Sequence, residues 1–317
     1  MKILVTGAAG FVGKVLSTRL VKSSYTVRAA VRACSVSDVG LTAVGEITEL
    51  TDWTAVLDGV DVVIHLAARA HKLNERGADL LSEYRRVNVG GTKGLIDQCI
   101  KSGVKRFIFV SSIGVNVSGD PVDTPYSECC VCSPYTSYAL SKYEAEQVVT
   151  RASNAGLIET VIVRPPLVYA GHAPGNFQRL LKIVHSGLPL PFAALNNKRS
   201  MIALENLVDF LTLCVWHPAA ANELFLVADE LSVSTPQIVR YISEGMGKKA
   251  NLLPAPDIFM RWGAQLVGRK DLYFQLCKSL VVDASKARDL LRWTPSLSIE
   301  EGLRNSGLEF SNRFARL

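Results

Sequence analysis

The sequence predicts an α/β protein with a doubly wound parallel sheet and a smaller C-terminal lobe. Three observations predict it. Short apolar runs alternate with helical stretches through the first half of the chain, as in parallel sheets covered by helices on both faces. The first run, residues 2–6, leads directly into a glycine-rich turn and a helix. Beyond Arg164 the segments become shorter and most of the 13 prolines occur, which indicates a second lobe.

The apolar runs and the turn residues between them define the expected elements. Strands are expected over residues 2–6, 25–31, 61–66, 106–111 and 159–164, with helices ending near Lys22 and spanning about 84–101 and 138–151. Residues 222–228 are expected to return to the main sheet as another strand. The predicted organisation is a main domain over residues 1–170, with returning segments near 198–228, and a smaller lobe formed mostly by residues 171–317.

Composition limits the class of protein. Hydrophobic residues make up 48% and charged residues 20% of the 317 positions, which is ordinary for a well-cored globular chain. We find no apolar run of 18 residues, so no membrane span is expected. The start of the chain leads into a strand instead of a signal sequence, which favours a cytoplasmic location. The net charge of +6 is dispersed without basic runs, so no nucleic-acid partner is expected.

The seven cysteines do not indicate a metal site. Cys129, Cys130 and Cys132 are clustered, but no second Cys or His group follows at a ligand spacing. We therefore expect no metal and interpret these residues as reduced thiols in a loop.

The glycine-rich turn predicts a dinucleotide site. Gly7, Gly10 and Gly13 follow the first strand with a G-x-x-G-x-x-G spacing. Glycine permits a positive φ and lets backbone N–H groups approach a pyrophosphate at a helix N-terminus. The alternative for an isolated triplet is a tight turn without a ligand. Its position in the first βαβ unit favours NAD or NADP.

The end of the second strand should select between NAD and NADP. A carboxylate there would bind the ribose hydroxyls, but Val31 is followed by Arg32. A guanidinium can clamp a 2′-phosphate, so Arg32 slightly favours NADP. Alternatively, Arg32 is solvated or stacks on adenine.

Three residues have the character of a hydride-transfer site. Tyr138 and Lys142 lie at i and i+4 and so share one face of a helix. Ser112 follows the strand expected at 106–111, although a shift in register would substitute Ser111. One cation about 5 Å away contributes on the order of 3 kcal/mol at an effective dielectric of 20, less than the ~4 kcal/mol needed to bring a phenol from a pKa near 10 to neutrality. An oxidised nicotinamide ring would add a second positive charge.

Six motifs occur in order along the chain and together resemble one family. They are TGAAGFVG at Thr6–Gly13, HLAA at His65–Ala68, VNVGGT at Val87–Thr92, FVSSIGV at Phe109–Val115, YALSK at Tyr138–Lys142 and RPPLVYA at Arg164–Ala170. The chain resembles the extended short-chain dehydrogenases/reductases of the NAD-dependent epimerase/dehydratase family. The resemblance implies a Rossmann domain over residues 1–170 and a substrate-binding lobe over most of 171–317.

The resemblance also implies roles for individual residues. Ser112 would donate to the sugar oxygen, Tyr138 would exchange its proton, and Lys142 would hold the nicotinamide ribose. The implied cofactor contacts are Gly7, Gly10, Phe11, Val12, Gly13, Arg32, Glu46, Ile47, Leu66, Ala67, Ala68, Asn88, Ser111, Tyr138, Lys142, Pro165 and Val168. Ser112, Tyr138, Asn176 and Arg199 would contact the substrate, with a solvated Arg199 as the alternative. A homodimer through residues 84–101 and 138–151 is implied as well.

The substrate indicated by this resemblance is a UDP-sugar. Residues 111–116 and 199–201 are similar to those of enzymes acting at C4 of UDP-N-acetylhexosamines and their 6-deoxy derivatives in bacterial surface-polysaccharide synthesis. Arg32 favours a 4-keto reductase, and a 4-epimerase is the first alternative. A ketoreductase of non-sugar substrates and a catalytically silent dinucleotide-binding regulator are the others. Leu167 and Ala170 replace the family's usual Asn and Gly, so sugar contacts cannot be transferred there.

Overall fold

A seven-stranded sheet forms the centre of the computed structural model, which describes residues 1–33, 40–69, 79–118, 124–255 and 276–314. Its strands are parallel and follow the order β3-β2-β1-β4-β5-β6-β9. The strands are β1 (Lys2–Thr6), β2 (Thr26–Val31), β3 (Leu41–Ala43), β4 (Val62–His65), β5 (Arg106–Val110), β6 (Glu159–Arg164) and β9 (Glu223–Leu226). This doubly wound parallel sheet confirms the predicted fold class, and β9 is the expected returning strand.

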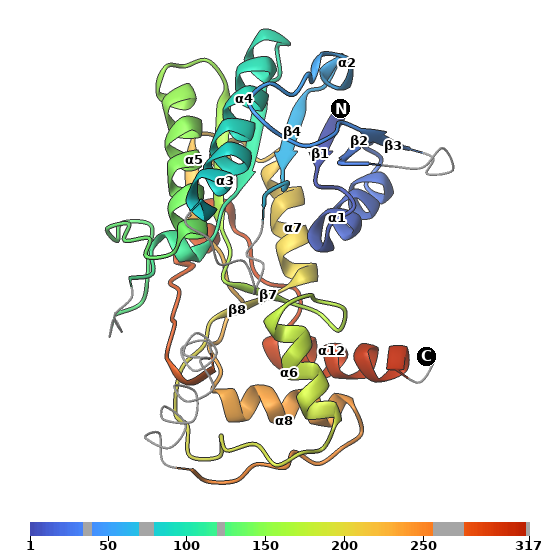
Figure 1. Cartoon of the computed structure of the whole chain (residues 1–317), viewed down its shortest axis with the longest axis vertical. Coiled ribbons are helices and arrows are strands. Elements are labelled where there is room, and N and C mark those ends of the chain that lie inside the picture. The colour runs from blue at the N-terminus through green and yellow to red at the C-terminus, as the bar shows by residue number, and fades with distance from the viewer. Residues whose placement is uncertain (34–39, 70–78, 119–123, 256–275, 315–317) are drawn as a thin grey trace.

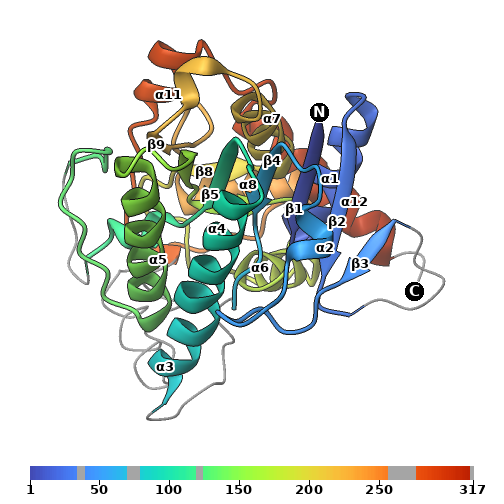
Figure 2. The ribbon, with the colours of Figure 1, turned by 90° about the horizontal axis from the view of Figure 1, so that it is seen from above.

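Alternating side chains of the strands build two separate cores, one on each face. Ile3 and Val5 of β1 face one layer, whereas Leu4 faces the other. Figure 2 shows the sheet between these layers. The first layer contains α1 (Phe11–Lys22), α7 (Leu204–Cys214) and α11 (Ser285–Leu291), and the second contains α2 (Thr54–Leu57), α4 (Gly91–Lys101) and α5 (Ser137–Asn154). Such two-sided burial explains why the strands are continuous apolar runs.

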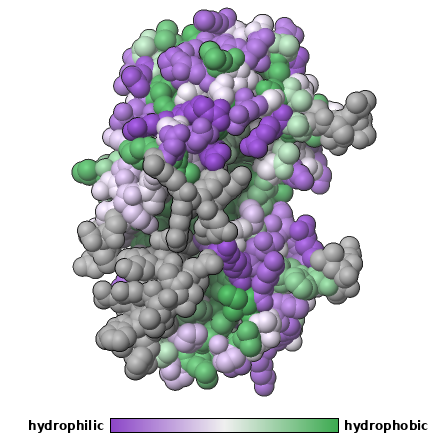
Figure 3. Space-filling view, viewed as in Figure 1, coloured by the Kyte–Doolittle hydropathy of each residue, from purple (hydrophilic) through white to green (hydrophobic). Residues whose placement is uncertain are grey.

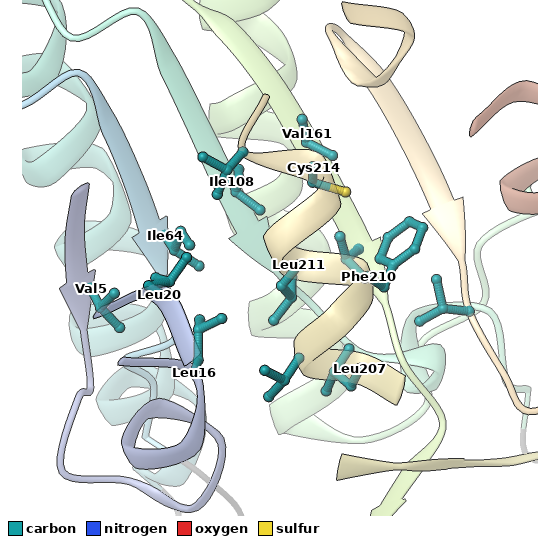
Figure 4. Packing of buried hydrophobic residues seen from close by; sticks show 14 of the residues in the cluster. Val5, Leu16, Leu20, Ile64, Ile108, Val161, Leu207, Phe210, Leu211 and Cys214 are labelled. Carbon is teal, nitrogen blue, oxygen red and sulfur yellow. The ribbon is translucent and has the colours of Figure 1, made fainter. Parts of the chain in front are cut away.

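The first layer is closed by α7, although its sequence follows the main run of strands. Figure 4 shows Leu211 of α7 on the side that faces Leu16 and Leu20 of α1, whereas Phe210 points to the other side and packs on Phe225 of β9. The segment near 198–228 therefore contributes both a covering helix and an edge strand to the main sheet.

The second lobe is smaller and mostly helical. It contains α6 (Asn176–His185), α8 (Thr235–Gly245) and α12 (Ile299–Phe314), and a two-stranded sheet of β7 (Leu167–Tyr169) and β8 (Met201–Ala203) lies between it and the main sheet (Figure 1). A Cβ at Gly307 would lie 2.2 Å from the Ile242 carbonyl oxygen, so glycine allows α8 and α12 to pack with their backbones close together. On the face that Figure 3 shows, hydrophilic and hydrophobic residues are mixed wherever the surface is coloured.

The predicted helix over 84–101 has an unexpected geometry. The structure divides it into α3 (Leu80–Tyr84), a π-helical turn η1 (Arg85–Gly90) and α4. Helical periodicity does not reveal the register change of a π turn, and such turns are frequent at functional sites. The short elements β3 and α2 were not expected either, because their few residues carry no recognisable period.

Candidate active site

The glycine-rich turn is packed so tightly that side chains are excluded. Gly7 has φ +67°, and a Cβ there would lie 2.9 Å from the Ala67 nitrogen. A Cβ at Gly13 would lie 2.2 Å from the Gly7 carbonyl oxygen. The first turn of α1 contains no acidic residue, and its N-cap Gly10 provides no side-chain cap. This cradle fits the pyrophosphate of a dinucleotide, because the helix N-terminus has donors that no side chain covers.

The turn lies against the segment that leaves β4. Leu66, Ala67 and Ala68 are half-buried, and the Ala67 N–H donates to Thr6 Oγ1 at 3.2 Å. Phe11 and Val12, which follow the turn, are also half-buried. These predicted cofactor residues therefore come together at the carboxyl ends of β1 and β4, where ligands of open α/β sheets bind.

The predicted adenine-side residues lie in two different environments. Arg32 is exposed after β2, and Glu46 is bound by Arg86 at 3.0 Å. The Arg86 hydrogen bond and charge lower the pKa of the Glu46 carboxyl, with smaller contributions from Arg32 and Arg69. Ile47 instead packs on Gly91 of α4, where a Cβ would lie 2.6 Å from its Cγ2.

Ser111 and Ser112 differ in environment, which bears on the register of the catalytic serine. Ser112 Oγ accepts from the Gly114 N–H at 3.1 Å, and a Cβ at Gly114 would lie 3.3 Å from that oxygen and 3.4 Å from Ala139 Cβ. Gly114 thus lies between Ser112 and Ala139, the residue that follows Tyr138 in the first turn of α5. Ser111 Oγ is buried and has no hydrogen-bond partner among the described residues. Its unpaired hydroxyl at the end of β5 is available to form a hydrogen bond with a bound cofactor.

Tyr138 and Lys142 occupy the first turns of α5, whose N-cap Thr136 accepts from the Ala139 N–H. Lys142 is 2% exposed, and its Nζ lies 4.1 Å from the centre of the Phe109 ring. Desolvation lowers the pKa of Lys142 to about 7, against a smaller opposing effect of Glu146. Burial, and then Tyr84, raise the pKa of Tyr138 to about 12. Burial therefore shifts both groups toward their neutral forms, which is the adverse effect of desolvation expected for such a pair.

A buried ion pair on the next turn of α5 favours the charged form of Lys142. Glu146 binds Arg164 through two hydrogen bonds of 2.9 and 2.5 Å, and each side chain is 4% exposed. Arg164 also donates to Asn116 Oδ1 at 2.9 Å and to Cys132 Sγ at 3.3 Å. The sequence reasoning missed Glu146, whose spacing of four from Lys142 was the available signal.

Asn88 lies in the π turn and connects two parts of the site. Its Oδ1 accepts from the Arg69 N–H at 2.8 Å, while its Nδ2 donates to Ser141 Oγ at 3.0 Å. Ser141 in turn donates to the Tyr138 carbonyl at 2.7 Å. Asn88 was predicted to contact the cofactor, and the structure gives both ends of its amide protein partners.

Asn176 is the predicted substrate residue that lies in the helical second lobe. Asn176 begins α6 and lines a pocket of about 440 Å³ together with Arg179, Lys182, Leu190 and Phe192. The sequence reasoning did not identify these other lining residues, because their roles depend on how α6 meets residues 190–192.

Arg199 is a half-buried cation near this pocket's lining segment at Leu276. Its Nη1 donates to the Lys278 carbonyl at 3.0 Å, and no carboxylate within the described ranges forms an ion pair with it. Desolvation lowers the pKa of Arg199 to about 10. A guanidinium with this environment suits an anionic ligand, whereas the solvated alternative requires greater exposure.

Residues after β6 show where the chain departs from the motifs. Pro165 is buried, Val168 is half-buried, and Leu167 is 40% exposed. Tyr169 is buried and its hydroxyl donates to Asp229 at 2.7 Å, so this side chain connects β7 to the segment that follows β9.

The structure also bears on metals and membranes. Within the described part of the chain, no group of three or more His, Cys, Asp and Glu side chains could hold a metal ion. Over the same residues, no helix combines the length and apolar character that crossing a bilayer requires.

The fold and this arrangement define a Rossmann-type short-chain dehydrogenase/reductase. Residues 3–228 match the NAD dependent epimerase/dehydratase family, and the chain belongs to that family. A UDP-glucose 4-epimerase of Vibrio cholerae is 40% identical over 311 residues, covering 97% of this chain and 95% of the relative. The N-acetyl-alpha-D-glucosaminyl-diphospho-ditrans,octacis-undecaprenol 4-epimerase of Escherichia coli O157:H7 is 28% identical, covering 80% and 75%. The solved UDP-N-acetylglucosamine 4-epimerase of Bacillus cereus has a TM-score of 0.79 at 20% identity, covering 98% and 99%.

Proposed function

We propose that this protein is an NAD-dependent 4-epimerase of a UDP-linked sugar, with UDP-glucose or a UDP-N-acetylhexosamine as substrate. The observation that carries the proposal is the placement of Tyr138 and Lys142 in the first turns of one helix, with Lys142 buried against the Phe109 ring. An epimerase must remove a proton from the C4 hydroxyl and later return it, so its acid/base group must change protonation state within one cycle.

NAD, when bound, supplies the hydride acceptor and, in its oxidised form, a positive charge near the phenol. Without that charge Tyr138 keeps its proton, since its pKa is raised to about 12. A nearby positive charge favours the phenolate, which can then accept the C4 hydroxyl proton. When hydride returns to C4, the 4-keto oxygen becomes a hydroxyl oxygen again and Tyr138 gives it the proton, which restores the phenolate. Ser112 orients that oxygen by a hydrogen bond, and Lys142 holds the ribose.

Arg199 supports a sugar diphosphate as the substrate. Its guanidinium has a carbonyl partner, is half-buried and forms no carboxylate pair within the described ranges, so it can bind a phosphate oxygen. The pocket at Asn176 adds Arg179 and Lys182 beside the apolar surface of Leu190 and Phe192, which suits a charged nucleotide with a flat base. The 4-epimerases reported above act on sugars carried by diphosphates, which agrees with this choice.

The test begins with the cofactor carried by the freshly purified, acid-denatured protein. We expect near-stoichiometric NAD, and interconversion of UDP-glucose with UDP-galactose, or of the N-acetylated pair, without added cofactor. Substrate deuterated at C4 should retain its label in the product, because hydride returns to the same carbon. Absence of both the dinucleotide and the interconversion would exclude an epimerase.

A 4-keto-sugar reductase is the second candidate, and Arg32 is the observation that favours it. Arg32 is exposed at the end of β2 and could bind a 2′-phosphate. Glu46 opposes this role because its carboxylate interacts electrostatically with Arg32 and would repel the phosphate. Protein purified without dinucleotide, with NADPH bound at least tenfold more tightly than NADH, would favour the reductase. Loss of that preference in Arg32→Ala would assign it to this guanidinium.

A further inference from the structure

A buried hydrogen-bond chain crosses the main domain below the glycine-rich turn. The Ala67 N–H donates to Thr6 Oγ1, which lies 2.7 Å from His65 Nδ1. His65 Nε2 lies 3.1 Å from Thr92 Oγ1, which donates to the Asn88 carbonyl at 2.6 Å. The chain thus connects the segment after β4, through β1 and α4, to the π turn.

The donors and acceptors of this chain determine the tautomer of His65. Thr92 uses its single hydroxyl proton for the Asn88 carbonyl, so it must accept from His65 Nε2–H. The neutral ring then has an unprotonated Nδ1, which accepts from the Thr6 hydroxyl. In an imidazolium, Nδ1–H would also point at Thr6 Oγ1, and the Thr6 proton would lose its acceptor. The geometry therefore requires a neutral ring in the Nε2–H form.

The surroundings of His65 oppose protonation as well. The ring is 1% exposed, and Phe107 and Phe109 lie with their ring centres 5.8 Å from it. The charged group that acts on it is Lys142 of α5, on the Phe109 ring. Desolvation, and then Lys142, lower the pKa of His65 to about 3. A second cation beside the Phe109 ring would make the Lys142 ammonium less favourable.

We propose that neutral His65 is a positioning residue, which holds the Ala67 segment and the Asn88 turn in register with the Tyr138 helix. Asn88 makes this possible because its side chain continues the chain to Ser141, and Ser141 binds the Tyr138 carbonyl. His65 therefore couples the cofactor-facing segment to the helix that carries the acid/base residues. This inference rests on the proposed function for its catalytic meaning, but the state of the ring is a property of the cofactor-free protein.

The first test is ¹⁵N NMR of the histidine-labelled, cofactor-free protein, with signals assigned through His65→Gln. We expect His65 to show the Nε2–H tautomer, with no titration between pH 8 and about 5. Titration of His65 in that range, or an Nδ1–H tautomer, would overturn the proposal. Neither outcome depends on the substrate. The His65 proposal can therefore fail while the 4-epimerase proposal stands, and the 4-epimerase proposal can fail while the His65 proposal stands.

The second test removes one link of the chain without removing His65. Thr92→Val takes away the acceptor of Nε2–H at similar volume, and Thr92→Ser is the matched control that keeps a hydroxyl. We expect Thr92→Val to alter the His65 tautomer signals and to shift the pH profile of kcat. It should also lower kcat by about tenfold, with a smaller change in KM. Thr92→Ser should resemble the wild type in all three measurements. If Thr92→Val lowers only thermal stability, with tautomer and pH profile unchanged, His65 has a purely structural role and the proposal is wrong.

Discussion

Replacing Glu146 with Gln should destabilise the protein by about 3–5 kcal/mol, because the substitution leaves a buried guanidinium without its counter-charge. Glu146 and Arg164 are each 4% exposed and share two hydrogen bonds. Asn116 Oδ1 and Cys132 Sγ remain as neutral partners, and neither compensates the charge. The free energy of unfolding is measured by urea titration of the variant and the wild type at pH 7.

The matched control lies two residues away on the same helix. Glu144 binds Arg85, but these side chains are 26% and 49% exposed, so Glu144→Gln should cost less than about 1 kcal/mol. If Glu146→Gln destabilises the protein no more than Glu144→Gln does, the reasoning from burial is refuted.

The same substitution should affect the reaction separately from stability. Glu146 raises the pKa of Lys142, against the larger lowering effect of desolvation. In Glu146→Gln the pKa of Lys142 should fall from about 7 to a lower value, so the protonated fraction of Lys142 at neutral pH decreases. The decrease of kcat on the alkaline side of its pH profile should therefore begin at a lower pH than in the wild type. Adding Arg164→Met should recover part of the stability while the altered pH profile remains, and recovery of both would mean that the profile only reports unfolding.

Three further predictions follow from single contacts. Gly13→Ala should abolish NAD binding and destabilise the protein by about 1–3 kcal/mol, because its Cβ would lie 2.2 Å from the Gly7 oxygen. Gly10→Ala, whose Cβ would lie 3.0 Å from that oxygen, should have smaller effects on NAD affinity, measured by calorimetry, and on the free energy of unfolding. Tyr138→Phe should keep NAD binding but lower kcat at least ~10²-fold, and full turnover would remove Tyr138 from the acid/base role. The pKa of His65 is lowered to about 3 in the folded protein, so on acidification the histidine takes up a proton first in the unfolded chain. The free energy of unfolding should therefore fall by about 2 kcal/mol from pH 7 to pH 5 through this group. Urea titrations of His65→Gln should not show this loss.

The fold was predictable because its sheet is buried on both faces. Strands such as 106–110 and 159–164 therefore appear as continuous apolar runs, and Tyr138 to Lys142 keeps its i, i+4 spacing in any helix. The π turn at Arg85–Gly90 was not predictable, since its six residues are too few to show a period of their own. The pocket at Arg179 and Phe192 was missed for another reason, because it exists only where two segments of the second lobe meet.

Buried polar side chains are the part of the site that sequence patterns describe least. His65, Glu146 and Asp229 each lie among apolar positions, and each is satisfied by partners distant in sequence. An apolar period predicts that such a position is buried, but hydrogen bonds to other elements determine whether a charge there is neutralised or paired. In this protein both solutions occur around Lys142, because its charge acts on His65 and the Glu146 carboxylate acts on Lys142. His65 is neutral within its hydrogen-bond chain and adds no second cation, while Glu146 raises the pKa of Lys142 and so favours the ammonium. The protonation of Lys142 is therefore set first by its burial and then by Glu146, a residue that contacts neither substrate nor cofactor in the proposed mechanism.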